Sequence, residues 1–264
     1  MDDILKKILA TKHEEIAEKT QSLPLSEIRI LAQSKTETRD FLEQIKKSAS
    51  QNTPAVIAEI KRASPSKGII REHFDPIEIA LSYERHGATC LSILTDSQYF
   101  QGSDNFIAQV KEQVNLPILR KDFIIDPYQV YEAKILGADC ILLIVAALKV
   151  EKLAELFDLA TTLELDVLVE VHDITELEQA LKLNIEMVGI NNRNLKTFET
   201  SLTTTIDLLY NIPSSVTVVT ESGIKNSEDI SLMRANNVNC FLVGEAFMRA
   251  EDPGIALKEL FYPV

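Results

Sequence analysis

Gly87-Ala88-Thr89-Cys90 and Gly137-Ala138-Asp139-Cys140 repeat one local pattern, a glycine followed at once by an apolar run. Glycine readily adopts the positive φ that ends a helix, so each pattern predicts a helix C-terminus leading into a strand. Asp75-Pro76-Ile77-Glu78 and Asp126-Pro127-Tyr128-Gln129 predict the opposite boundary, with an acidic N-cap, a proline at the first helical position and Glu or Gln at the third. The chain therefore reuses one strand and helix unit.

Eight short apolar runs are predicted as strands, with helical segments between them. They lie near residues 54–60, 88–94, 117–121, 138–145, 166–171, 186–190, 216–220 and 240–243. Eight such units, spaced about 20 to 35 residues apart, predict an α/β fold of the (β/α)₈ TIM-barrel class. A doubly wound open sheet is the alternative, and it is disfavoured because no predicted strand is followed by Gly-x-Gly-x-x-Gly.

The first fifty residues differ from the rest because they contain no strand-like run. Ile4, Leu5, Ile8 and Leu9 form a helical stripe, and further apolar stripes follow near residues 25–31 and 41–45. We therefore expect an N-terminal helical extension over residues 1–50 and one barrel domain over residues 51–264. The 149–163 segment, apolar at helical spacing, is expected to be a core-facing helix.

Composition limits the classes of function. The chain has 264 residues, 45% apolar and 25% charged, which suits one domain with a large core. It contains no run of 18 apolar residues and no secretory signal, so we expect a soluble cytoplasmic protein without membrane contact. The three cysteines, Cys90, Cys140 and Cys240, lie far apart in apolar runs, which predicts buried reduced thiols.

The charge of the chain argues against nucleic acid as a partner. The net charge is −13, whereas binding to a phosphate backbone requires a basic face. Basic residues nevertheless concentrate locally in three groups: Lys61, Arg62, Lys67 and Arg71; Arg120 and Lys121; and Arg193 and Lys196. If these side chains converge in one cleft, they can concentrate a small anion there.

Polar side chains at the strand ends indicate where the function lies. They are Glu59, Lys61, Lys121, Glu170, Asn191, Arg193 and Glu221. A strand buried on both faces is normally apolar, so an ionisable group at its end needs a partner, a ligand or a reaction. Glu59 and Lys61 are expected on one face, the barrel lumen, either as a structural ion pair or in a catalytic or anion-binding role.

The last two strands are predicted to carry a phosphate site. Glu221-Ser222-Gly223-Ile224 follows strand 7, and Gly244-Glu245-Ala246 follows strand 8. These are the two loops that commonly bind phosphate in this fold, and each contains a glycine where backbone N–H groups can approach a ligand. The histidines, His13, His73, His86 and His172, show no metal-ligand spacing. His172 follows Glu170 by two positions and could border the pocket, but we expect it to be solvated at the surface.

Ordered blocks of this sequence carry a family resemblance. They are Glu59-Ile60-Lys61-Arg62-Ala63-Ser64-Pro65-Ser66, Leu91-Ser92-Ile93-Leu94-Thr95-Asp96 with Tyr99-Phe100-Gln101-Gly102-Ser103, Lys121-Asp122-Phe123-Ile124-Ile125-Asp126, Leu168-Val169-Glu170-Val171-His172, Gly189-Ile190-Asn191-Asn192-Arg193-Asn194-Leu195 and Glu221-Ser222-Gly223-Ile224. Together they resemble the indole-3-glycerol phosphate synthase family of tryptophan biosynthesis. The resemblance spans residues 54–250.

The resemblance implies a reaction and a set of roles. The reaction is ring closure of 1-(2-carboxyphenylamino)-1-deoxyribulose 5-phosphate with loss of CO₂ and water, without metal or organic cofactor and with a small anionic substrate as partner. The implied catalytic residues are Lys121 as general acid, Glu170 as acid/base, and Glu59, Lys61 and Asn191. The implied substrate contacts are Ser64, Phe100, Phe123, Arg193, Glu221 and Ser222. The implied phosphate contacts are Lys61, Ser222, Gly223, Gly244 and Glu245.

Glu245 departs from some members of that family, which carry a small hydroxyl residue there. Its backbone N–H is expected to serve the phosphate while its side chain turns outward. Lys121 is expected to have a lowered pKa, because a neighbouring cation disfavours the charged form of a lysine.

Other functions are less compatible with these residues. Phosphoribosylanthranilate isomerase, a related barrel, uses a cysteine near the end of strand 1, where this chain has Glu59 and Lys61. A noncatalytic phosphate-binding barrel does not explain a candidate acid and a candidate base in one mouth. The chain is expected to be a monomer.

Overall fold

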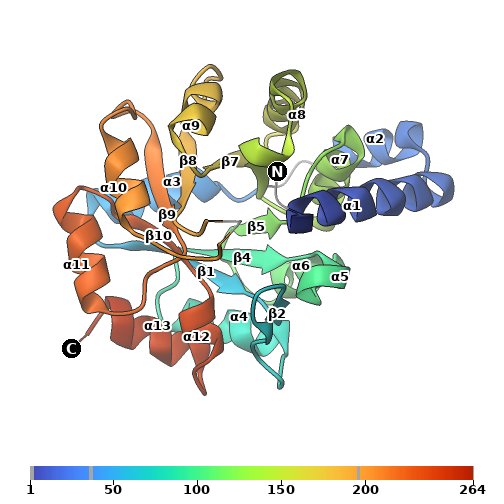
Figure 1. Cartoon of the computed structure of the whole chain (residues 1–264). Coiled ribbons are helices and arrows are strands. Elements are labelled where there is room, and N and C mark those ends of the chain that lie inside the picture. The colour runs from blue at the N-terminus through green and yellow to red at the C-terminus, as the bar shows by residue number, and fades with distance from the viewer. Residues whose placement is uncertain (1–2, 36–37, 195–196, 264) are drawn as a thin grey trace.

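The computed structural model describes residues 3–35, 38–194 and 197–263, and its centre is a closed barrel of eight parallel strands (Figure 1). The strands are β1 (Ala55–Ile60), β4 (Cys90–Leu94), β5 (Ile118–Lys121), β6 (Cys140–Ile144), β7 (Asp166–Val171), β8 (Met187–Asn191), β9 (Thr217–Glu221) and β10 (Cys240–Val243). Each pairs with its neighbours in chain order, and β10 closes the ring against β1. The predicted fold class is confirmed.

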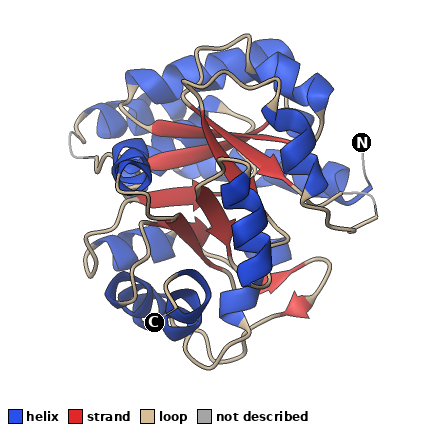
Figure 2. Cartoon of the chain, turned by 90° about the vertical axis from the view of Figure 1, so that its left-hand side faces the viewer, coloured by secondary structure: helices blue, strands red, loops and turns tan. Residues whose placement is uncertain are grey.

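Helices surround the barrel, so that each strand has a covered outer face (Figure 2). Those that follow the barrel strands are α4 (Pro76–Arg85), α5 (Ser97–Phe100), α6 (Asn105–Lys111), α7 (Pro127–Leu136), α8 (Val150–Thr162), α9 (Ile174–Ala180), α10 (Thr203–Leu209), α11 (Ser227–Ala235), α12 (Glu245–Met248) and α13 (Pro253–Phe261), with a short 3₁₀ turn, η1 (Val145–Ala147). Within the described part of the chain, none of the helices has the length and apolar character needed to cross a bilayer.

The predicted helix boundaries are present. The carboxylate of Asp75 accepts hydrogen bonds from the N–H groups of Ile77 and Glu78, and Asp126 forms a reciprocal capping box with Gln129. At the other ends, Gly87 and Gly137 have φ of 95° and 91°. The sequence pattern of proline after an acidic cap and glycine before a strand thus sets the phase of the strand and helix unit.

The barrel lumen near the N-terminal ends of the strands, here called the lower lumen, is filled by apolar side chains. Cys90, Cys140 and Cys240 are buried and free, as predicted. Phe41, the first residue of α3 (Phe41–Ser50), is fully buried in the same cluster, and its carbonyl oxygen lies 3.7 Å from Sγ of Cys90. Among the described residues, α3 therefore packs against this end of the barrel lumen, and the large cavity opens at the opposite end, where the strands terminate.

A small hairpin was missed by the sequence analysis. β2 (Ala63–Ser64) and β3 (Gly68–Ile69) pair antiparallel in the loop after β1. Each strand has two residues, which is too short to show a periodic pattern. The hairpin places Ser64 beside the open end of the barrel.

The N-terminal extension docks on the barrel through buried charge. It consists of α1 (Asp3–Ser22), α2 (Leu25–Gln33) and α3. Lys12 of α1 is buried, and its Nζ lies 2.9 Å from Oδ2 of Asp96 and 3.0 Å from Oδ1 of Asp122. Burial alone would lower the pKa of Lys12, but the two carboxylates raise it above the ordinary value. Asp96 and Asp122 follow β4 and β5, so this contact ties α1 to the open end.

We predict that Lys12→Ala lowers the free energy of unfolding by about 3–5 kcal/mol, because it takes the Lys12 cation away from buried Asp96 and leaves buried Asp122 with Arg120 at 3.5 Å. Guanidinium denaturation measures the loss. Lys46→Ala is the matched control: its partner Glu186 is 2.9 Å away, but the two side chains are 43% and 69% exposed, so the loss should stay below about 1 kcal/mol. Equal losses in the two variants would contradict the prediction.

Candidate functional site

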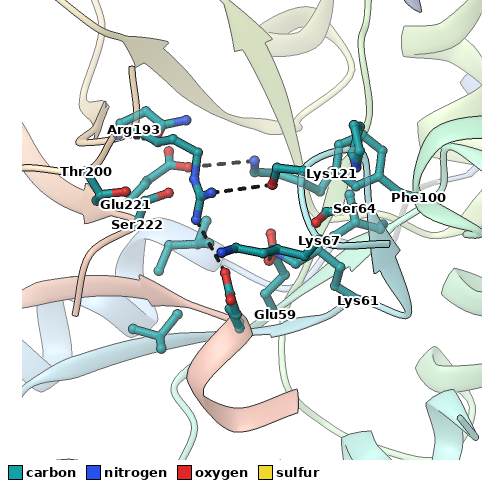
Figure 3. A pocket seen from close by; sticks show the side chains of 18 of the residues that line it. Glu59, Lys61, Ser64, Lys67, Phe100, Lys121, Arg193, Thr200, Glu221 and Ser222 are labelled. Atoms are coloured by element: carbon teal, nitrogen blue, oxygen red, sulfur yellow. Dashed lines mark hydrogen bonds and ion pairs between the residues drawn. The ribbon is translucent and has the colours of Figure 1, made fainter. Parts of the chain in front are cut away.

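A cavity of about 780 Å³ opens where the barrel strands end. All of the sequence-predicted site residues line it: Glu59, Lys61, Ser64, Phe100, Lys121, Phe123, Glu170, Asn191, Arg193, Glu221, Ser222, Gly223, Gly244 and Glu245. Figure 3 shows Glu59, Lys61 and Lys121 around the same space as Glu221, with Arg193 reaching across it. Residues from all parts of the barrel thus meet around one volume.

Glu59 and Lys61 form the ion pair expected at the end of β1. Nζ of Lys61 donates a short hydrogen bond to Oε2 of Glu59. Burial alone would raise the pKa of Glu59, but Lys61 and Lys121 outweigh it and hold the pKa below its ordinary value. Glu59 is therefore an anion at neutral pH, and Lys61 faces the cavity with its positive charge partly compensated.

Lys121 lies among carboxylates, which overturns the expectation of a lowered pKa. Its Nζ is 3.5 Å from Oε2 of Glu170 and 3.7 Å from Oε2 of Glu221. Burial lowers the pKa of Lys121, but Glu170, Glu221 and Glu59 together raise it above the ordinary value. The prediction was wrong because it counted cations adjacent in the sequence, whereas the neighbours in space are anions. Arg120, for example, points away from the lumen to Asp104 and Glu132.

Glu170 and Glu221 are neighbouring carboxyl groups that share Lys121 as a partner. Both are buried, and each acts on the pKa of the other. Burial and the charge of Glu170 raise the pKa of Glu221 to about 8. Burial acts in the same direction on Glu170, but Lys121, His172 and Nδ2 of Asn191, which donates to Oε1 at 3.3 Å, lower its pKa. At neutral pH the proton therefore sits on Glu221 and the charge on Glu170.

Two glycines make room for these carboxylates. A Cβ on Gly189 of β8 would overlap Oε1 of Glu221, and a Cβ on Gly244 would overlap the carboxyl group of Glu59. Any side chain at either position would push a carboxylate out of place. In the sequence, Gly189 is only one letter of a family motif. The close approach of the Glu221 carboxyl group, which requires a glycine there, is shown by the three-dimensional structure.

The two predicted phosphate loops both border the cavity. After β9, Ser222 and Gly223 have φ of 61° and 97°, so the chain turns sharply at the strand end. Left-handed backbone costs a non-glycine residue about 1–2 kcal/mol, which marks Ser222 as a constrained position. Glu245 begins α12, and its carboxylate pairs with Arg193 at 3.4 Å and Arg249 at 2.9 Å. Its charge is therefore neutralised by two arginines.

The aromatic wall is formed by Phe100 and Phe123, whose ring centroids are 6.0 Å apart. The charged groups at the bottom of the cavity, Glu59, Lys121, Glu170 and Glu221, form its floor. Several other lining residues were not predicted from the sequence. They include Ile4, Leu5 and Ile8 of α1, together with Thr200, Lys225 and Arg249, whereas Lys67, which also lines the cavity, belongs to a basic group that the sequence singled out. An apolar stripe indicates that a helix has one buried face, but not what that face covers. Here it covers the mouth of the cavity.

His172 corrects a second expectation. Its side chain is only 13% exposed, with Nε2 3.4 Å from Oε1 of Glu170 and Nδ1 3.0 Å from Oε2 of Glu176. It is therefore not a solvated surface residue. Period-two geometry from Glu170 across the end of β7 places both side chains on the same side, and the helix cap that follows brings Glu176 within reach.

A family model and a curated relative indicate the same family, and a solved structure shows the same fold. The family model of indole-3-glycerol phosphate synthase matches residues 5–260. The chain is 56% identical over 261 residues to indole-3-glycerol phosphate synthase of Polaromonas sp. (strain JS666 / ATCC BAA-500), covering 99% of both sequences. Among solved structures, it resembles KGPDC from Streptococcus mutans with a TM-score of 0.61 over 78% of this chain and 94% of that one. At 13% identity, this likeness shows the fold alone.

Glu221 should make stability depend on pH. Because its pKa is about 8 in the folded protein and 4.5 in its ordinary state, the folded protein holds a proton that the unfolded chain has lost between these values. The stabilisation is complete below 4.5 and is lost as the pH rises through about 8.

We predict that Glu221→Gln gains stability relative to the unsubstituted protein between pH 5.5 and 8.5, by at most about 1.4 kcal/mol for each pH unit. Urea denaturation at both pH values measures the difference. Glu228→Gln, at an exposed position, is the control and should show no such trend. A difference independent of pH in Glu221→Gln would show that Glu221 is ionised in the folded state.

Proposed function

Since this chain belongs to the indole-3-glycerol phosphate synthase family, we propose that its cavity closes the indole ring of 1-(2-carboxyphenylamino)-1-deoxyribulose 5-phosphate, releasing CO₂ and water. The protein is thus a carboxy-lyase of tryptophan biosynthesis. One observation in the site supports this function above the others: the ammonium group of Lys121, 15% exposed, lies between Glu170 and Glu221 at the floor of a cavity that cations and an aromatic wall surround.

Lys121 is proposed as the general acid. Its raised pKa keeps the ammonium group protonated at neutral pH, so the acid is loaded before substrate binds. When the ring carbon attacks, the substrate carbonyl becomes an alkoxide, which is a stronger base than an amine. The proton then moves from Nζ to that oxygen, and the carboxylates around Lys121 stabilise the ammonium until the alkoxide forms.

Glu170 is proposed to act in the later proton transfers. Dehydration needs a base that removes a proton from the ring carbon and an acid that protonates the leaving hydroxyl group. Glu170 is ionised and lies beside a protonated Glu221, so the site offers one group of each kind. Asn191 donates to Glu170 and keeps its carboxylate oriented. The Glu59–Lys61 pair supports these steps from β1, where Lys61 also attracts the anionic substrate.

The two ends of the substrate are proposed to bind on opposite sides of this floor. Ser64 and Arg193 take the carboxylate end, while Phe100 and Phe123 flank the aromatic ring. The phosphate accepts hydrogen bonds from the backbone N–H groups of Ser222, Gly223, Gly244 and Glu245, and Lys61 lies nearby. Asn191, Glu221 and Ser222 contact the substrate hydroxyls. Binding both ends of the substrate holds the two reacting carbons within attack distance. The entropy lost in bringing them together is a large part of the activation barrier of a ring closure.

We also propose that the enzyme works as a monomer in the cytoplasm, without metal or organic cofactor. The charged groups of the floor all come from one chain, and the three cysteines are free thiols. The helical extension over residues 1–50 is proposed as a part of the catalytic unit of residues 51–264, because α1 lines the same cavity.

The experiment that tests the function is direct. Purified protein is incubated with the carboxyphenylamino-deoxyribulose phosphate, and indole fluorescence and CO₂ release are followed. Stoichiometric formation of both products is expected. Binding without either product would instead indicate a noncatalytic phosphate-binding barrel.

We predict that Lys121→Ala lowers kcat by about 10²- to 10⁴-fold, because general acid catalysis contributes about that factor. Circular dichroism should show that the fold survives. Lys152→Ala is the control, since Lys152 lies on α8 with its side chain 37% exposed, outside the cavity lining, and its ion pair in the described structure is with Glu155; it should leave kcat unchanged. Near-normal turnover in a folded Lys121→Ala protein would exclude Lys121 as the acid.

A further inference from the structure

The proposed reaction consumes one proton in each turnover. The carbonyl oxygen takes up two protons on leaving as water, and one proton leaves the neighbouring carbon as the ring double bond forms. Equivalently, an ionised carboxylate enters and neutral CO₂ departs. This net proton must come from solvent, although the acids and bases of the site lie at the floor of the cavity, beneath the bound substrate.

A chain of three side chains leads from that floor toward the surface. Glu170 is 4% exposed, His172 13% and Glu176 18%, so exposure rises along the chain. Nδ1 of His172 is 3.0 Å from Oε2 of Glu176, and the same oxygen accepts the backbone N–H of His172 at 2.8 Å. Glu176 is fixed in turn, because its N–H donates to the N-cap Asp173 at 2.9 Å. The ring therefore has one orientation.

The other ring nitrogen of His172 faces the site. Nε2 is buried and 3.4 Å from Oε1 of Glu170, a distance that makes an ion pair without the alignment of a hydrogen bond. With a carboxylate on each side, the ring favours the imidazolium form, in which both nitrogens carry protons. The titratable groups that act on it are Glu170 on β7, Glu176 on α9 and, once it is ionised, Glu221 on β9. Contact with Glu176 and Glu170 outweighs burial and raises the pKa of His172.

We propose that His172 relays the consumed proton from solvent to Glu170, an inference that rests on the proposed function. The N–H bond at Nε2 breaks as an O–H bond forms at Oε1 of Glu170, leaving a neutral imidazole and a neutral carboxylic acid. The imidazole then takes one proton from a solvent acid, with Glu176 holding the ring. His172 acts through Glu170 and does not touch the substrate.

The test separates the first turnover from later ones. In His172→Gln, Glu170 begins in its equilibrium state, so a single turnover with excess enzyme should keep its rate within about twofold, whereas steady-state kcat should fall about tenfold or more. Glu176→Gln should show the same pattern more weakly. His73→Gln, at an exposed loop position, is the matched control and should behave as the unsubstituted enzyme.

Rescue by a small buffer gives the second readout. In His172→Ala, kcat should rise with the concentration of added imidazole, which can carry the proton into the vacated space, and His73→Ala should not respond. Equal slowing of first and later turnovers without imidazole rescue would assign His172 a structural role and overturn the proposal. Unchanged kinetics in His172→Gln would also overturn it.

A measurement without turnover keeps this proposal distinct from the proposed function. NMR titration of His172 should give a pKa above the ordinary value of 6.5, and Glu170→Gln should lower that pKa by removing one facing carboxylate. If the unsubstituted enzyme forms no indole product, the proposed function is wrong. If Glu170→Gln leaves the pKa of His172 unchanged, the contact on which the relay depends is wrong.

Discussion

Charge balance inside a dry barrel is the constraint on which this site depends. Among the described residues, Glu59, Glu170 and Glu221 are all buried beside two lysines of the cavity, Lys61 and Lys121. His172 also contacts Glu170, but the carboxylate of Glu176 on its other side balances its charge. Three ionised carboxylates in this space would leave one negative charge uncompensated, at a cost of several kcal/mol. The proton on Glu221 removes that charge, so two anions face two cations. The floor is thereby neutral overall while it keeps an acid and a base in contact.

The barrel backbone makes this arrangement possible. Parallel strands end on one rim, and their inward positions converge, so groups from β1, β5, β7 and β9 meet although they are far apart in the chain. Close contact also needs space, which Gly189 and Gly244 provide by carrying no Cβ beside the carboxylates. The apolar lower lumen excludes water from below. Strong pKa shifts at the floor follow from this exclusion as much as from the charges.

Much of this could be read from the sequence. Glycine and proline signals placed the strands, and charged residues such as Lys121 and Glu170 stood out because a buried strand end is otherwise apolar. What failed were statements that depend on distance. The pKa of Lys121 is raised, not lowered, because carboxylates from other strands surround it. His172 was expected in solvent, yet the turn after β7 folds it against Glu170. The apolar stripe of α1 was visible, but its place over the cavity was not.

The chain as a whole is acidic, whereas the upper part of the cavity is lined by cations. A net charge of −13 would repel a substrate carrying a carboxylate and a phosphate, if the charge were spread evenly. At physiological ionic strength, however, exposed charges are screened within about 8 Å, whereas charges lining a low-dielectric cavity are screened less. Lys67, Arg193, Lys225 and Arg249 line its upper part, above the balanced floor. An anion near the mouth therefore meets these cations first, and because the floor is neutral overall it does not cancel their attraction.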